Sequence, residues 1–257
     1  MPDDIFNKIL SELSEIQYDG EICLSYFNEP LLCTKIFNRI EQLRRNLPNS
    51  FIYLFTNGEF LVKKHFQLLP DAGLDLLLID IYTDEKEMSY NPHAAHKVAK
   101  SLIERIGLPL NITPESEHIN VYCKYDNMDI EIITRDFNTF ASNRAESLSS
   151  DLPIPKICGH PLLCIKNFIS YHIDYSGGVY PCPNYHRDFE KHREFCLGNV
   201  LEESIYDIYI GKKMSDYRER HFFHRDTLPC RSCIWNFYSF ITNRFYRPFR
   251  DRPKTRR

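Results

Sequence analysis

The chain has 257 residues, a formal net charge of −3 and 43% hydrophobic residues, so it is long and apolar enough to fold around a core. This composition excludes a chain that is disordered along most of its length. The charge is uneven, because residues 238–257 carry six Arg and one Lys against one Asp. We interpret these residues as a basic C-terminal tail that is solvated or contacts an anionic partner, and nucleic-acid binding is not expected because no other basic surface is evident.

Helical and strand-like segments alternate in the first two-thirds of the chain. Apolar residues at helical spacing predict four helices, over residues 1–16, 31–47, 60–69 and 92–106. Short apolar runs predict four strands, over residues 21–27, 51–55, 74–82 and 118–125. This alternation is typical of an α/β fold with a parallel sheet, whose functional loops lie at the carboxyl ends of the strands. A helix stands before the first predicted strand, so the strand on which it would normally pack is missing.

The pattern changes after about residue 137. Asp151–Pro155 resembles a linker, and a β-hairpin is predicted to turn on Ser176-Gly177-Gly178, between residues 168–175 and 179–181. A helix from about Ser204 to His221 follows. We therefore expect a small irregular module after the α/β part of the chain.

Residues 1–16 lack the basic start and apolar centre of a signal peptide, and no apolar run approaches the ~18 residues of a membrane-spanning helix. A cytoplasmic location is the resulting expectation, with no membrane partner. Thiols stay reduced there, so the nine cysteines indicate metal binding or burial rather than disulfide bonds. Three of them, Cys23, Cys33 and Cys123, lie in apolar segments and are expected in the core.

Four cysteines form the strongest chemical pattern in the sequence. Cys164 and Cys182 flank the predicted hairpin, and Cys230 and Cys233 form a Cys-x2-Cys turn that directs two thiolates at one ion. Four thiolates suit either zinc or a [4Fe–4S] cluster, and the spacing alone does not decide between them. The neighbouring Cys158 and Cys196 are alternatives to any one of these ligands.

The order of these residues resembles a known family. Cys164-x12-Gly177-x4-Cys182, then Gly198-Asn199-Val200, then Cys230-x2-Cys233, is similar to the auxiliary-cluster module of radical S-adenosylmethionine (SAM) enzymes, called SPASM or, in its shorter form, twitch. No cysteine follows Cys233, so the resemblance is to the twitch form. It implies one auxiliary [4Fe–4S] cluster, with zinc as the alternative metal.

The first half of the chain resembles the same family. Asn28-Glu29-Pro30 follows the first predicted strand and is similar to the family's Gly-Gly-Glu-Pro motif, which receives the amino group of SAM. Thr56-Asn57-Gly58 resembles its Thr-Asn-Gly turn, and Asn143-Arg144-Ala145 the segment that leads into the module. The resemblance implies that Asn28, Glu29, Thr56 and Asn57 belong to the SAM site.

The resemblance implies a partial (β/α) TIM-like barrel over residues 1–150, missing its first strand, followed by the cluster module over residues 151–237 and the tail over 238–257. It implies a radical SAM-type oxidoreductase or maturase that acts on a peptide, sugar or aminocyclitol with an electron-donor protein. The family's catalytic Cys-x3-Cys-x2-Cys triplet does not occur in the 257 residues, so SAM cleavage is not expected of the sequence as written. The alternative is a non-catalytic iron–sulfur or zinc scaffold with a degenerate form of this fold.

Overall fold

The computed structural model describes residues 1–82, 91–108, 119–134, 144–148, 166–223 and 229. The chain divides into two compact units, one formed by Leu13–Thr139 and the other by Met1–Glu12 with Phe140–Arg257. The predicted boundary between a barrel of residues 1–150 and a module of residues 151–237 remains a prediction.

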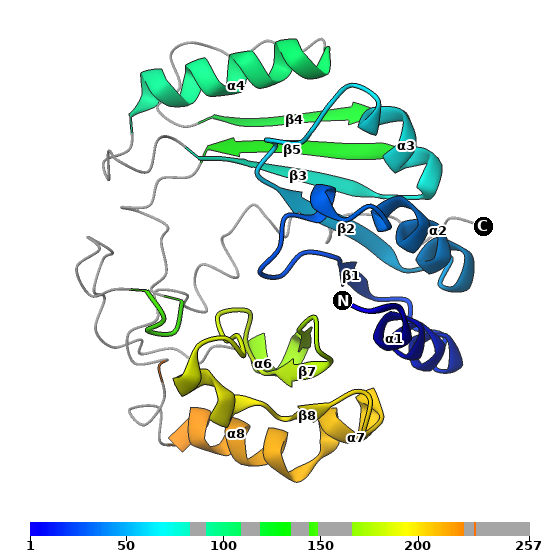
Figure 1. The fold of residues 1–257 in the computed structure, drawn as a ribbon, viewed down its shortest axis with the longest axis vertical. Helices are drawn as coiled ribbons and strands as arrows, with labels where there is room; N and C mark the ends of the chain where they lie inside the picture. The colour runs from blue at the N-terminus through cyan, green and yellow to red at the C-terminus, as the bar shows by residue number, and fades with distance from the viewer. Residues whose placement is uncertain (83–90, 109–118, 135–143, 149–165, 224–228, 230–257) are drawn as a thin grey trace. The chain divides into compact units, whose positions relative to one another are not determined.

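A five-stranded sheet forms the first unit (Figure 1). Its strand order is β1-β2-β3-β5-β4, with bounds Glu21–Cys23, Phe51–Thr56, Leu76–Ile81, Met128–Thr134 and Asn120–Tyr125. The first four strands of this order are mutually parallel, which confirms the predicted α/β fold. Every residue of β3 is buried, as expected for a central parallel strand.

Two details of the predicted sheet are wrong. The fourth predicted strand, here β4, is antiparallel to its neighbour, and β5 was not predicted. The reason is the two-residue turn Asp126-Asn127 between them, which can join only antiparallel strands. The left-handed backbone of Asp126, with a φ of 53°, suits such a tight hairpin turn.

The helices of this unit are α2 (Ile36–Asn46), α3 (His65–Ala72) and α4 (Pro92–Ile106), preceded by a 3₁₀ turn η1 (Pro30–Leu32). The predicted helix over residues 31–47 is therefore divided into η1 and α2. The predicted helix over residues 60–69 begins five residues late, at His65, because the backbone first forms turns in which the N–H of Leu61 bonds to the carbonyl of Gly58 and the N–H of His65 to that of Val62. The prediction for residues 92–106 is correct, with Asn91 accepting the amide hydrogen of Ala94 as the N-cap.

The second unit is built around a small three-stranded sheet of β6 (His172–Ile173), β7 (Gly178–Tyr180) and β8 (Gly198–Asn199), all antiparallel. The predicted hairpin is β6–β7, although residues 166–169 form a short helix, α6, rather than strand. The helices are α1 (Asp3–Glu15), η2 (Glu190–Phe195), α7 (Ile205–Ile210) and α8 (Lys212–Phe223). The helix predicted over residues 204–221 is interrupted at Gly211.

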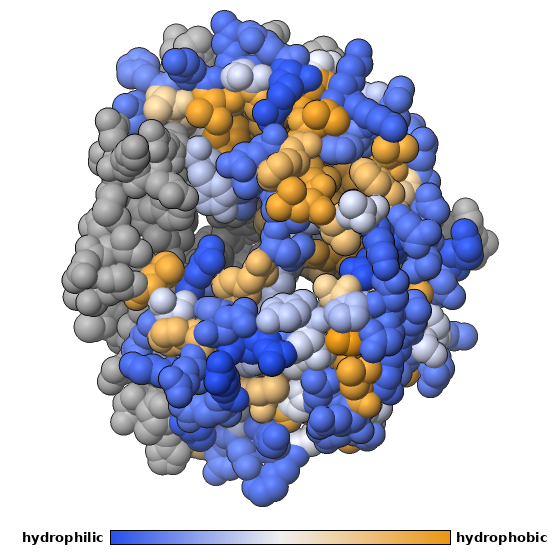
Figure 2. Space-filling view, in the orientation of Figure 1, coloured by the Kyte–Doolittle hydropathy of each residue, from blue (hydrophilic) through white to orange (hydrophobic). Residues whose placement is uncertain are grey.

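Most of the surface seen in Figure 2 is hydrophilic, and apolar side chains gather over the strands between α4 and α3. Scattered exposed apolar residues are normal for a folded protein. No helix within the described residues is long and apolar enough to cross a membrane.

Candidate cofactor-binding site

The carboxylate of Glu29 joins the carboxyl ends of β1 and β2. Its Oε1 accepts a hydrogen bond of 2.7 Å from Oγ1 of Thr56, and its Oε2 accepts one of 3.0 Å from the backbone N–H of Asn57. Oε1 also accepts the N–H of Leu31 at 3.1 Å, which caps the start of η1. Three of the predicted site residues are thus brought together from positions 27 and 28 residues apart in the sequence.

The turn after β2 is held by its own side chains. Oγ1 of Thr56 accepts the N–H of Gly58 at 3.1 Å, and Oδ1 of Asn57 accepts the N–H of Glu59 at 3.0 Å. Gly58 has a φ of 76°, and a Cβ there would lie 3.1 Å from a methyl carbon of Ile79. Glycine is required at position 58 because of this left-handed backbone and because of the close approach to Ile79. This explains the last residue of the Thr-Asn-Gly turn.

Ser25 is a residue of this edge that the sequence reasoning missed. Its Oγ accepts the N–H of Phe55 at 2.9 Å and donates to the carbonyl of the same residue at 3.0 Å. The side chain therefore continues the pairing of β1 with β2 beyond Cys23, where the backbone ladder ends. Its position two residues after the end of a short parallel strand is the only signal in the sequence.

Asn28 does not join this group of side chains. Its Oδ1 accepts the N–H of Tyr26 at 2.8 Å, and its Nδ2 donates to the carbonyl of Leu24 at 3.5 Å, so the side chain closes its own loop. Glu29 is half-buried, and each carboxylate oxygen has two acceptor positions. Because Oε2 accepts one hydrogen bond from the described residues, it can accept another from an ammonium group.

The hairpin of the second unit is held by Asp174. Its Oδ1 accepts three hydrogen bonds, from the N–H of Ser176 at 2.8 Å, from the hydroxyl of Ser176 at 2.7 Å and from the N–H of Gly178 at 3.0 Å. Nδ2 of Asn199 donates to the carbonyl of Ser176 at 3.0 Å. A Cβ on Gly177 would lie 2.7 Å from Oδ1 of Asn199. The glycines and the Gly-Asn-Val segment of the predicted motif therefore pack against one another.

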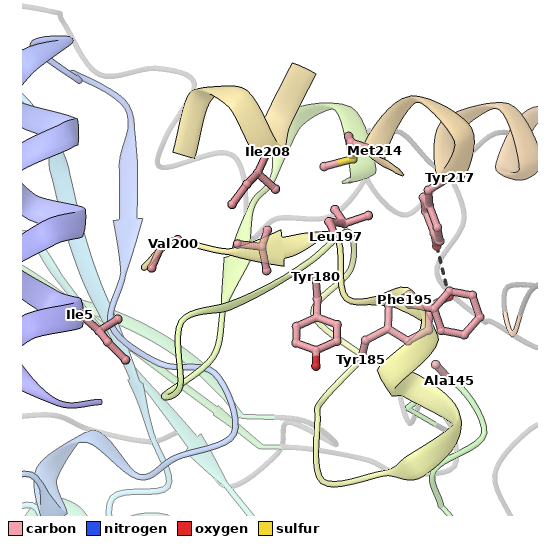
Figure 3. Packing of buried hydrophobic residues seen from close by; sticks show 11 residues of the cluster. Ile5, Ala145, Tyr180, Tyr185, Phe195, Leu197, Val200, Ile208, Met214 and Tyr217 are labelled. Carbon is pink, nitrogen blue, oxygen red and sulfur yellow. Dashed lines mark hydrogen bonds between the residues drawn. The ribbon is translucent and has the colours of Figure 1, made fainter. Parts of the chain in front are cut away.

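A cluster of buried apolar side chains lies beneath this hairpin (Figure 3). Tyr185 stacks on Phe195 at 4.6 Å between ring centroids, and its hydroxyl shares a hydrogen bond of 3.2 Å with that of Tyr217. Ile5 of α1 belongs to the same cluster. Oε2 of Glu12 on α1 accepts the N–H of Ile205 at 2.6 Å, so α1 up to Glu12 is part of the cysteine-bearing unit.

Two cysteines of this unit lie within the described residues. Cys182 and Cys196 are both partly buried and pack against the apolar cluster. Burial raises the pKa of the Tyr180 hydroxyl, and the neighbouring Cys196 thiol and Asp174 carboxylate raise it further. Tyr180 is therefore a neutral hydroxyl beside the Cys196 thiol, two residues before Cys182.

His192 connects Ala145, in the segment that precedes the predicted module, to the buried apolar cluster. The ring is fully buried, its Nδ1 accepts the N–H of His186 at 3.2 Å, and its Nε2 lies 2.7 Å from the carbonyl of Ala145. An acceptor at Nδ1 and a carbonyl at Nε2 require the neutral ring with its proton on Nε2. Burial lowers the pKa of His192 and agrees with this state.

The other predicted metal ligands, Cys164, Cys230 and Cys233, lie outside the described residues, as does Cys158. Within the part of the chain that the structure describes, no group of three His, Cys, Asp or Glu side chains is arranged to hold a metal ion. The spatial convergence of the four cysteines therefore stays a prediction.

The described residues thus contain a parallel α/β unit with a strand-end carboxylate, which is a candidate cofactor site, and a cysteine-bearing unit with a hairpin. Residues 164–234 match the SPASM family, described as an iron–sulfur cluster-binding domain. The matched range runs from the first to the last of the four predicted cysteines and one residue beyond.

The chain is also similar to a named protein in sequence and to solved structures in fold. An S-adenosyl-L-methionine-dependent 2-deoxy-scyllo-inosamine dehydrogenase of Niallia circulans is 23% identical over 215 residues, 84% of this chain and 72% of that protein. The crystal structure of BtrN in complex with AdoMet and 2-DOIA is similar in fold, with a TM-score of 0.64 at 19% identity, over 91% of this chain and 80% of that one. BtrN in an open conformation has a TM-score of 0.54 at 17% identity, over 86% and 72%. Together with the SPASM match over residues 164–234, these similarities support the resemblance of the chain to radical SAM enzymes that carry a SPASM/twitch module.

Proposed function

We propose that the chain is the body of a radical SAM-type oxidoreductase or maturase that binds SAM at the strand-end edge and one auxiliary [4Fe–4S] cluster in the SPASM module. The observation that carries this proposal is the Glu29 carboxylate, which joins the ends of β1 and β2 and retains an acceptor position at Oε2. In this assignment Oε2 receives the ammonium of SAM. Thr56 and Asn57 hold the carboxylate in place, and Asn28 shapes the loop before it.

In the module we assign Cys164, Cys182, Cys230 and Cys233 as the cluster ligands. The donor chemistry fits, because four thiolates are the usual ligands of a [4Fe–4S] cluster. When bound, such a cluster accepts or donates single electrons. The chain's own contribution is to hold Cys182 beside the hairpin that Asp174 and Asn199 fix.

The Niallia circulans relative is named as a dehydrogenase of an aminocyclitol. Of the three substrate classes that the sequence left open, we therefore favour a small polyhydroxylated ring that carries an amino group. Because the 257 residues contain no Cys-x3-Cys-x2-Cys triplet, we propose that they do not cleave SAM on their own. We further propose a cytoplasmic location, where an electron-donor protein supplies the reducing equivalents.

Binding of SAM to the anaerobically reconstituted chain tests this assignment. Isothermal titration calorimetry is expected to show binding to the wild type and at least tenfold weaker binding to Glu29→Gln, since the amide cannot pair with an ammonium. Glu59→Gln removes the same charge from an exposed position in the neighbouring turn and should bind SAM as the wild type does. Equal affinity of the wild type and Glu29→Gln would reject the role of Glu29.

A further inference from the structure

The Thr-Asn-Gly turn that holds Glu29 is itself held by a side chain of α4. Nη2 of Arg105, in the last turn of α4, donates a hydrogen bond to the carbonyl of Gly58. The same carbonyl accepts the N–H of Leu61 at 3.2 Å, so both of its acceptor positions are used. All of these residues belong to the compact unit of Leu13–Thr139.

The chain after β2 also packs against the end of this helix. A Cβ on Gly58 would lie 3.4 Å from Cδ1 of Leu102, and Leu102 is buried. A Cβ on Gly107, which ends α4, would lie 3.6 Å from Cδ of Lys63. These apolar contacts keep the turn close to α4, whereas the Arg105 hydrogen bond is directional and fixes the orientation of the Gly58 carbonyl.

A chain of hydrogen bonds joins Arg105 to Glu29 through this turn. The N–H of Gly58 donates to Oγ1 of Thr56, which in turn donates to Oε1 of Glu29. The N–H of Asn57 donates to Oε2 of the same carboxylate. A rotation of the turn would therefore move a donor to each of the two carboxylate oxygens.

We propose that Arg105 is a positioning residue of the SAM site, because it anchors the turn whose donors orient the Glu29 carboxylate. This inference rests on the proposed function, in which that carboxylate receives the ammonium of SAM. The charge of Arg105 alone would act in the opposite direction, since SAM has a net positive charge and a guanidinium repels it. Loss of the side chain should weaken SAM binding through the turn, whereas a pure charge effect would strengthen it.

Isothermal titration calorimetry of SAM into the full chain, reconstituted anaerobically, measures the effect. Arg105→Met removes the donor and keeps an apolar stem, and it is expected to weaken SAM binding about fivefold, the typical effect of one hydrogen bond. Arg105→Lys keeps the charge and a donor and should recover part of the affinity. Lys100→Met is the matched control, because it removes a positive charge from an exposed position of the same helix and should bind SAM as the wild type does.

A double-mutant cycle separates positioning from a general loss of structure. In Glu29→Gln the turn has no carboxylate to orient, so the further change Arg105→Met should alter SAM affinity by less than about twofold. An equal loss of affinity in both backgrounds would show a merely structural role and overturn the inference. An unchanged or increased affinity of Arg105→Met in the wild-type background would overturn it as well.

Failure of the SAM site itself gives a different result. A wild-type chain that binds no SAM, or a Glu29→Gln variant with wild-type affinity, rejects the proposed function and this inference with it. Weaker binding by Glu29→Gln together with wild-type binding by Arg105→Met overturns the role of Arg105 alone.

Discussion

Arg44 at the end of α2 connects the amino ends of β2 and β3. Its guanidinium donates to the carbonyls of Gly73, Pro48 and Ser50 at 2.8–3.1 Å and forms an ion pair with Asp75. The same oxygen of Asp75 accepts the N–H of Ile52 at 2.8 Å, at the start of β2. We predict that Arg44→Met destabilises the fold by removing all of these contacts at once.

The magnitude follows from what the substitution leaves behind. The Asp75 side chain is only 11% exposed, so loss of its cation leaves a poorly solvated carboxylate with a single backbone donor, a cost of roughly 2 kcal/mol. The carbonyls of Gly73 and Ser50 lose their charged donor, which adds about 1 kcal/mol. We expect the free energy of unfolding to fall by about 3 kcal/mol in total.

Urea denaturation followed by circular dichroism measures this change. Arg45→Met is the matched control, because Arg45 is the exposed neighbour on the same helical turn and its loss should change the free energy of unfolding by less than about 0.5 kcal/mol. A loss below 1 kcal/mol in Arg44→Met would refute the reasoning, since it would mean that the network does not hold these strand ends together.

Three further predictions concern the SPASM module. Burial lowers the pKa of His172 to about 3 against an ordinary 6.5, so the unfolded chain binds a proton that the folded chain does not. The free energy of unfolding should therefore fall by up to about 1.4 kcal/mol per pH unit as the pH drops from 6.5 towards 3, and His172 should have no such effect above pH 6.5. In urea titrations, the free energy of unfolding of His172→Gln should depend less on pH than that of the wild type. Gly177→Ala should lower the free energy of unfolding by at least about 1 kcal/mol, because the φ of 85° at Gly177 and the contact with Asn199 exclude a Cβ. A thermal unfolding midpoint equal to that of the wild type would show that the hairpin can relax around the added methyl group. Cys182→Ser should sharply lower the iron content per chain, and Cys33→Ser should not. Equal iron contents in the two variants would reject the assigned ligands.

The sequence was most informative where a feature depends on local pattern. The helix at Pro92–Ile106 has an Asn N-cap, a Pro at its start and a Gly after its end, so its bounds could be predicted. The antiparallel β4–β5 pair was missed although its signal is equally local. In β5 the charged residues Asp129 and Glu131 interrupt the apolar run, and the sequence does not show that Glu131 is buried.

Long-range contacts could not be predicted. The sequence indicated that Glu29 and Thr56 end neighbouring strands, but not that one carboxylate oxygen bonds to the Thr56 hydroxyl, because that depends on the register of β1 and β2. Nor could it indicate that Ile5 and Glu12 pack with residues nearly two hundred positions later. An amphipathic helix shows which face is apolar but not which surface covers it.

The central claim is that the SPASM module of this chain holds one [4Fe–4S] cluster. The most direct measurement is iron, acid-labile sulfide and zinc per chain in protein purified and reconstituted without oxygen. The account predicts about four iron and four sulfide per chain, without stoichiometric zinc. One zinc per chain with no iron would contradict it and would favour the zinc scaffold that the cysteine spacing alone allows.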